Sequence, residues 1–303
     1  MNKPKITVIG ASNVDITGFT KSKLIYQDAN IGTMETSAGG VGRNIAENLM
    51  RLGFDVNLIS VFGDDALSSF IIDSCKALNL NIEGSLLLNN AATPTFIAIM
   101  DEQNDLALGI SAMTIFDTLS DDFILNQIEK IKKSDYVVLE TNMPEKVLKA
   151  VVSNAPNQKY VLDTVSGKKG LRAKGILEYL YILKMNLLEA NILSGFNIEK
   201  GSDYPKLIQY FLDKGVENVF ITLGEQGVIY GNKTEINTME TIPTKIVNTI
   251  GAGDAFVSGI VYGDSLDLEI DKIAKIGMQA ASINVQSNTS VSTEMCVTAI
   301  KKM

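Results

Sequence analysis

The feature of this chain that most restricts its fold is a repeated alternation of short apolar segments with stretches of helical periodicity. Most of the apolar segments are continuous and rich in β-branched residues, as expected for strands buried on both faces of a parallel sheet. They cover residues 6–9, 56–61, 136–139, 160–162, 181–183 and 219–223. The expected helices cover residues 44–51, 66–78, 122–132, 144–152, 204–214, 254–262 and 271–285. This alternation predicts a layered α/β fold around a mostly parallel sheet.

Two segments, roughly residues 13–35 and 95–108, break the alternation. The second has the pattern of a hairpin, with apolar residues on both sides of the polar stretch 101–105. We expect the two segments to form a small β-sheet beside the core of a single α/β domain spanning residues 1–303. The pattern alone leaves open that they are two unrelated surface excursions.

Composition restricts the function as well as the fold. The 303 residues, 46% of them hydrophobic, can bury one large core, and the net charge is 27 − 35 = −8. This acidic balance argues against a nucleic-acid or membrane partner and suits an enzyme that acts on small molecules. Cys75 and Cys296 lie far apart without metal-type spacing, and no apolar stretch is long enough to span a membrane, so a cytoplasmic location is expected. The chain has no histidine, so any general base near neutral pH is a carboxylate or a perturbed Lys, Cys or Tyr.

The strongest chemical signal is Gly251-Ala252-Gly253-Asp254, which lies between an apolar segment and a helical pattern. Small residues at a helix N-terminus let several unpaired backbone amides converge on one point that favours an anion. A carboxylate beside that point suits phosphoryl transfer to a hydroxyl group, because the carboxylate takes the proton while the amides stabilise the moving charge. The alternative is that Asp254 is only a stabilising first-turn charge.

Two further groups of residues lie where a hydroxylated substrate would bind. Asn13 and Asp15 alternate directly after the first strand, and an amide paired with a carboxylate suits sugar hydroxyls. Gly39 and Gly40 would let a substrate lie against bare backbone, with Asn44 projecting from the following helix. Each group also has a plain structural interpretation, as a polar turn or as a helix start with an Asn cap.

Polar residues also follow two later strands. Asn186 and Glu189 have the spacing of a helix capping box. Thr222, Gly224 and Gly227 would allow a tight turn against a nucleotide, although any β-turn uses glycine. The chain lacks Gly-x-x-x-x-Gly-Lys-Ser/Thr, which excludes a P-loop kinase.

The residues Thr249-x-Gly251-Ala252-Gly253-Asp254-Ala255-Phe256 resemble the C-terminal signature of the ribokinase-like (PfkB) carbohydrate and nucleoside kinases. The other motifs occur in the order typical of that family and cover the whole chain. The resemblance implies a ribokinase-like three-layer core with a small β-sheet lid, ATP as phosphoryl donor, Asp254 as general base and an anion hole at Gly251–Gly253. It also implies a magnesium–phosphate assembly held, largely through water, by Asn186 and Glu189. The sugar pocket that it implies is lined by Asn13, Asp15, Gly39, Gly40 and Asn44.

Within the family, residues 39–49 and the pattern Asn13-Val14-Asp15 resemble bacterial pseudouridine kinases. The implied reaction converts ATP and pseudouridine into ADP and pseudouridine 5′-phosphate. A ribokinase or fructokinase of the same fold, and a catalytically silent sugar-binding relative, remain alternatives. Ribokinase has an aspartate that helps bind a monovalent cation where this chain has Asn248, so a cation site stays open.

The predicted lid has a mechanical purpose and a possible second role. A kinase must exclude water, since otherwise ATP is hydrolysed instead of transferred. The exposed edge of a small sheet is also a surface on which a second copy of the chain can pair, which would give a homodimer.

Overall fold

The computed structural model describes residues 3–103, 105–199 and 201–302. Its largest element is an eight-stranded sheet with the order β14-β13-β12-β11-β10-β9-β1-β4. The six strands from β4 to β12 in this order are parallel, and β13 and β14 extend that edge antiparallel. The strands are β1 (Lys5–Ile9), β4 (Asp55–Ile59), β9 (Tyr136–Glu140), β10 (Lys159–Asp163), β11 (Leu180–Asn186), β12 (Asn218–Thr222), β13 (Val228–Gly231) and β14 (Ile236–Met239).

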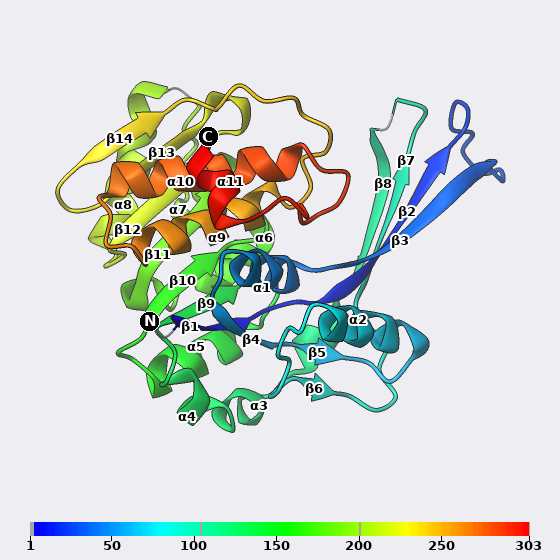
Figure 1. Ribbon diagram of the computed structural model, residues 1–303, viewed down its shortest axis with the longest axis horizontal. Helices are drawn as coiled ribbons and strands as arrows, with labels where there is room; N and C mark the ends of the chain where they lie inside the picture. Colours follow the sequence, from blue (N-terminus) through cyan, green and yellow to red (C-terminus); the bar gives the residue numbers. More distant parts are fainter. Residues whose placement is uncertain (1–2, 104, 200, 303) are drawn as a thin grey trace.

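Helices cover both faces of this sheet, which gives the predicted three layers (Figure 1). Side chains such as Val8, Ile45 and Phe256 form the core on one face. The helices on that side are α1 (Val41–Arg51), α2 (Ala66–Ala77), α9 (Ala252–Asp264), α10 (Ile270–Val285) and α11 (Val297–Lys302). The opposite core includes Leu139 and Phe211. Its helices are α3 (Asp121–Leu125), α4 (Ile128–Ile131), α5 (Glu145–Asn154), α7 (Leu187–Ser194) and α8 (Tyr204–Asp213), and the short α6 (Gly167–Gly170) packs on α7.

The two segments that break the alternation form one four-stranded sheet that projects from the body (Figure 1). Its order is β3-β2-β7-β8, with a parallel central pair and antiparallel outer pairs. The strands are β2 (Asn13–Thr20), β3 (Gly32–Gly39), β7 (Thr95–Met100) and β8 (Leu106–Ala112). Asn104, in the predicted hairpin turn, lies outside the described residues. The small sheet therefore exists as predicted.

The chain departs from the predicted elements at several places. The strand expected over 56–61 ends at Ile59, because the Ser60 amide donates to Ser85 Oγ (3.0 Å) and the chain continues as β5 (Val61–Phe62), paired with β6 (Leu86–Leu87). The helix expected over 122–132 is divided into α3 and α4, where the Gln127 amide forms a tighter bond to Ile124 O (2.9 Å). Strands β13 and β14 and helices α6, α7 and α11 were not among the predicted elements.

The parallel strands bring polar residues to one end of the sheet, where the strands have their carboxyl ends. Glu140, Asp163, Asn186 and Thr222 are the last residues of β9, β10, β11 and β12. Ligands of open α/β sheets bind at the carboxyl ends of the strands. Among the residues that the structure describes, no helix combines the length and the apolar character needed to cross a bilayer.

Candidate active site

The Gly251–Asp254 motif forms the N-terminus of α9, as predicted. Gly251 is the N-cap with φ +78°, and a Cβ atom there would lie 1.9 Å from Ser290 O. Helical bonding begins with the Ala255 amide, which donates to Gly251 O (2.9 Å). The amides of Gly253 and Asp254, in the first turn, therefore have no intrahelical acceptor, and they face the end of the helix that favours an anion.

Asp254 is a buried carboxylate with few partners. Its side chain accepts a hydrogen bond from Asn44 Nδ2 (2.9 Å), and the residue is only 7% exposed. Burial raises the pKa of Asp254 to about 8, and the nearby charge of Asp163 acts in the same direction, whereas the Asn44 bond and Lys184 lower it. A carboxyl group with a pKa near neutral pH is suited to taking up a proton.

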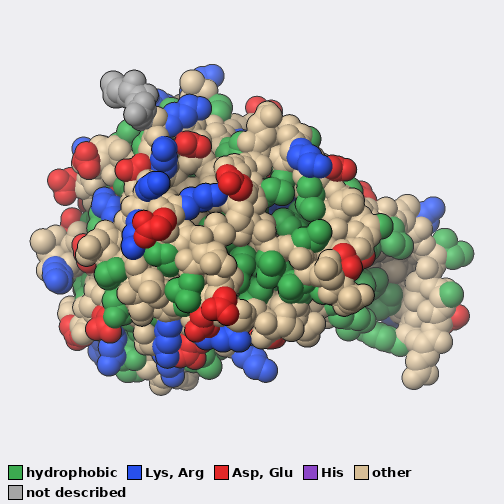
Figure 2. Space-filling model, turned by 90° about the horizontal axis from the view of Figure 1, so that it is seen from below, with side chains coloured by type: hydrophobic (Ala, Val, Ile, Leu, Met, Phe, Trp, Pro, Cys, Tyr) green, Lys and Arg blue, Asp and Glu red, His purple; other side chains and the backbone are tan. Residues whose placement is uncertain are grey.

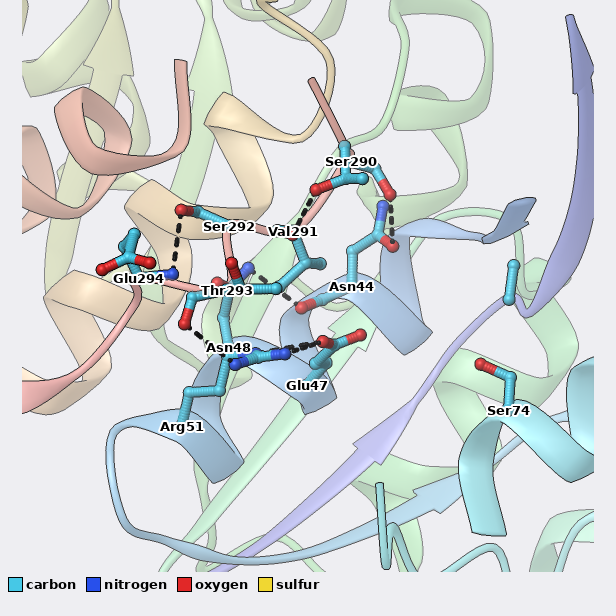
Figure 3. A network of polar contacts seen from close by, with 12 residues as sticks. Asn44, Glu47, Asn48, Arg51, Ser74, Ser290, Val291, Ser292, Thr293 and Glu294 are labelled. Carbon is cyan, nitrogen blue, oxygen red and sulfur yellow. Dashed lines mark hydrogen bonds and ion pairs between the residues drawn. The ribbon is translucent and has the colours of Figure 1, made fainter. Parts of the chain in front are cut away.

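Asn44 links helix α1 to this carboxylate. It also contacts the segment that follows α10 (Figure 3). Its Oδ1 lies 3.4 Å from Ser290 Oγ, which donates to it. Farther along α1, Glu47 pairs with Arg51 (2.8 Å), and Arg51 Nη1 donates to Thr293 O (3.2 Å). These contacts fix α1 against residues 290–293, and the Asn44 amide is held at one end by Asp254 and at the other by Ser290.

The residues predicted to contact the sugar lie together where β2 and β3 leave the body. Asn13 Nδ2 donates to Asp15 Oδ1 (2.6 Å), and Asn13 pairs with Gly39 across the two strands. A Cβ atom on Gly39 would lie 1.9 Å from Asp15 Oδ2, so any larger residue there would displace this carboxylate. Gly40 has φ +103°, and a Cβ atom on it would lie 2.5 Å from Ala11 O. Close packing against Asp15 and Ala11 therefore favours glycine at both positions, whether or not a substrate binds there.

Burial also acts on Asp15. It raises the pKa of Asp15 to about 6, although the bond from Asn13 and the charge of Arg43 lower it. Arg43 is itself buried on α1, where it pairs with Glu47 (3.2 Å) and donates to Ala38 O (3.2 Å) in β3. The helix that carries Asn44 is therefore also tied to the base of the small sheet.

The residues predicted to contact ATP lie at, or shortly after, the carboxyl ends of β11 and β12. Asn186 and Glu189 form a complete capping box on α7, with the Glu189 amide donating to Asn186 Oδ1 (2.9 Å). Asn186 pairs with Thr222 across β11 and β12. A shallow pocket at the carboxyl ends of these two strands is lined by Asn186, Leu187, Leu188, Tyr204, Thr222, Leu223, Gly224 and Gln226. Gly227 and Glu189 lie outside the pocket lining, Gly227 against Met239 O and Glu189 buried.

The fit of Asn186 and Glu189 to a magnesium ion depends on which oxygens are free. The Glu189 carboxylate already accepts bonds from Asn186 Nδ2 (2.8 Å), the Asn186 amide (2.8 Å) and Thr164 Oγ1 (2.7 Å). Among the described residues, no group of three or more acidic, Cys or His side chains is placed to hold a metal. Magnesium keeps several of its waters in protein sites. The arrangement therefore fits contact through those waters better than direct ligation.

Sequence reasoning missed three charged residues at or near the carboxyl ends of the parallel strands, namely Glu140, Asp163 and Lys184. The buried Glu140 carboxylate accepts bonds from the Ala11 amide and from the Asn142 amide (2.6 Å), and burial raises its pKa to about 7. Lys184 Nζ donates to Asp163 Oδ2 (2.9 Å). A signal was present, because each charge lies at the end of, or inside, a mostly apolar strand, where buried charges are rare unless paired.

Comparison with known proteins agrees with this architecture. The sequence profile of the pfkB family carbohydrate kinases matches residues 3–294. The pseudouridine kinase of Escherichia coli (strain K12) is 29% identical over 259 residues, which are 85% of this chain and 83% of that protein. A crystal structure of a putative sugar kinase from Clostridium perfringens has a TM-score of 0.86 and 30% identity, covering 100% of this chain and 96% of the other. An Arabidopsis thaliana ribokinase complexed with ribose and ATP shares the fold, with a TM-score of 0.82, 20% identity and 99% coverage of both chains. The chain thus belongs to the pfkB family of carbohydrate kinases and is a sugar or nucleoside kinase of that family.

Proposed function

We propose that this protein transfers the γ-phosphoryl group of ATP to the 5′-hydroxyl of pseudouridine. The observation that carries the transfer is Asp254, a buried carboxylate whose pKa is raised to about 8, placed at the open N-terminus of α9. Asp254 accepts a bond from Asn44 of the proposed ribose site, and its charge acts on Lys184 together with that of Glu189 of the proposed ATP site. A proton acceptor and an anion site are therefore close to residues of both proposed substrate sites. The similarity to the E. coli pseudouridine kinase supports the choice of nucleoside.

In this proposal each part of the site has one task. Asp15, Asn13 and Asn44 hold the ribose against the backbone of Gly39 and Gly40. The nucleotide occupies the pocket at Asn186, Thr222 and Gly224, next to the turn that Gly227 closes, and Glu189 contacts magnesium-bound water. The 5′-oxygen bonds to the γ-phosphorus as the bond to the β,γ-bridging oxygen breaks. The hydroxyl proton passes to Asp254, and ADP leaves.

The proposal is tested by measuring ADP release with pseudouridine, uridine, adenosine, ribose and fructose as acceptors. It predicts the highest kcat/KM with pseudouridine. A preference for ribose or fructose would favour the sugar-kinase alternative of the same family. Binding of an acceptor without ADP release from any of the five would favour a catalytically silent sugar-binding relative.

Asn248 leads to a prediction about monovalent cations. Its Oδ1 accepts from the Ile250 amide (2.9 Å) and its Nδ2 donates to Asn288 O (3.3 Å), so the amide itself joins the two loops. We expect turnover to change little when K⁺ is replaced by tetramethylammonium. The Asn248→Asp variant should become dependent on K⁺, because a carboxylate facing a carbonyl oxygen repels it unless a cation lies between them. Strong K⁺ dependence of the wild-type enzyme in steady-state assays would contradict this assignment.

We propose that the small sheet acts as a lid and also joins two copies of the chain. It projects from the body with hydrophobic side chains at its surface (Figure 2). Met34, Ile99 and Leu108 lie in register on one face, opposite to the face of Asp15, and Met34 and Leu108 are 73% and 55% exposed. Exposed apolar side chains along a sheet favour association.

Sedimentation analysis tests the dimer. The Leu108→Asp/Ile110→Asp variant should sediment as a monomer at concentrations where the wild type is a dimer, because both charges would be buried between the sheets. Thr33→Asp, on the opposite face of the sheet, is the matched control and should remain dimeric. A monomeric wild-type protein would exclude this interface.

We also propose a cytoplasmic location. Both cysteines are unpaired, in keeping with this proposal.

A further inference from the structure

A buried ion pair lies beside the start of α9, and none of the roles proposed above uses it. Lys184, on β11, retains 8% of its side-chain exposure, and its partner Asp163, on β10, retains 4%. The two residues are direct neighbours in the parallel register, with Nζ donating to Asp163 Oδ2 at 2.9 Å. Asp163 also accepts a bond from the Val165 amide (2.7 Å), which fixes the carboxylate.

The ammonium group of Lys184 lies against the anion-binding turn. A Cβ atom built on Gly253 would be only 2.7 Å from Lys184 Nζ, so the absence of a side chain at this position gives the ammonium room. The charges of Glu189 and Asp254 also act on Lys184. It therefore lies among the proposed base, the open amides of α9 and the residue proposed to contact magnesium-bound water.

This position is difficult to explain by stability alone. Strands β10 and β11 are already joined by their backbone ladder. A buried ion pair is often no more stabilising than apolar residues of similar volume. The positive end of a helix moreover repels an ammonium group, so Lys184 and α9 are an unfavourable pair until an anion lies between them.

We propose that Lys184 is a catalytic residue whose ammonium group binds an oxygen of the phosphoryl group during its transfer, together with the amides of Gly253 and Asp254. Asp163 holds the ammonium in place before ATP arrives. The inference rests on the proposed phosphoryl transfer and adds no reactant to it. As the 5′-oxygen replaces the bridging oxygen on the γ-phosphorus, Lys184 contributes positive charge and gives up no proton, because the hydroxyl proton goes to Asp254.

The experiment compares two variants that differ only at Lys184. Removing Lys184 alone would leave Asp163 as an unpaired buried charge and endanger the fold. We therefore compare Asp163→Asn with Asp163→Asn/Lys184→Met, since the first keeps the lysine and the second removes both charges. Relative to Asp163→Asn, the double variant should lose about 10²-fold in kcat, as expected when one preorganised donor to developing charge is removed. KM values for nucleoside and ATP should change far less than kcat.

A binding measurement separates this inference from the proposed function. MgADP with aluminium fluoride, which imitates the phosphoryl group in transfer, should bind the double variant more weakly than Asp163→Asn, whereas MgADP alone should bind both equally. Equal kcat values, or equal gains from aluminium fluoride, in two folded variants would overturn the role of Lys184. If the wild type phosphorylates no acceptor, the proposed function fails, and the aluminium fluoride comparison still decides whether Lys184 binds the anion.

Discussion

We expect the Asp254→Asn enzyme to turn over roughly 10³-fold more slowly than the wild type, within the range typical of the loss of a general base. Asparagine has almost the same shape and can keep a hydrogen bond to Asn44 through its oxygen, so the fold and the ATP affinity should be retained. It cannot accept the hydroxyl proton at any pH used in an assay. Steady-state kcat, with calorimetric ATP binding and circular dichroism as checks of the fold, measures the effect.

The pH dependence of kcat/KM in the wild type tests the same assignment of Asp254 as the base. The base acts only when it is deprotonated, and burial holds the pKa of Asp254 at about 8. The kcat/KM for the nucleoside should therefore rise with pH up to about 8 and then level off, and the variant should lack this rise. Asp73→Asn, which changes an exposed carboxylate on α2, is the control and should behave as the wild type. Near-normal turnover by a folded Asp254→Asn enzyme would rule out this base.

The second large effect is expected at Asp15. Removing one partner of a buried hydrogen bond to a charged group costs about 2–3 kcal/mol. Asp15→Ala should therefore lower kcat/KM for the nucleoside by about two orders of magnitude. The Kd for ATP should barely move, because ATP is assigned to the pocket at Asn186, Thr222 and Gly224.

One control variant and the pH dependence of the wild type test the assignment of Asp15. Glu83→Ala removes an exposed carboxylate that pairs with Lys130, and it should leave both substrates unaffected. In the wild type, KM for the nucleoside should rise as pH falls below about 6, because the charged carboxylate accepts hydroxyl protons and its pKa is raised to about 6. If Asp15→Ala weakens nucleoside and ATP equally, Asp15 has been placed in the wrong half of the site.

The elements that were predictable are those whose signal is local. Continuous apolar strands and periodic helices predicted the layers, and small residues before Asp254 predicted the open helix start. The split at Ser60 could not be predicted, because its amide bonds to Ser85, a residue 25 positions away. Strands β13 and β14 are four residues each, too short for periodicity to distinguish them from loops.

The contacts within the candidate site were also unpredictable, because they join residues that are far apart in the sequence. Asp254 and Asn44 were each found from their motifs, but the hydrogen bond between them joins residues 210 positions apart. Glu140, Asp163 and Lys184 were overlooked because each lies in a different strand, far from the others in the sequence. Only the parallel register, which pairs Asp163 with both Glu140 and Lys184, turns them into one cluster.

The most direct test of the central claim is the identity of the product. Wild-type enzyme incubated with MgATP and pseudouridine should yield ADP and one new nucleotide, whose phosphorus–proton couplings by NMR place the phosphate on the 5′-oxygen. The Asp254→Asn enzyme should give only a trace in the same time. A phosphate on the 2′- or 3′-oxygen, or the absence of any pseudouridine phosphate while ATP is bound, would contradict the account.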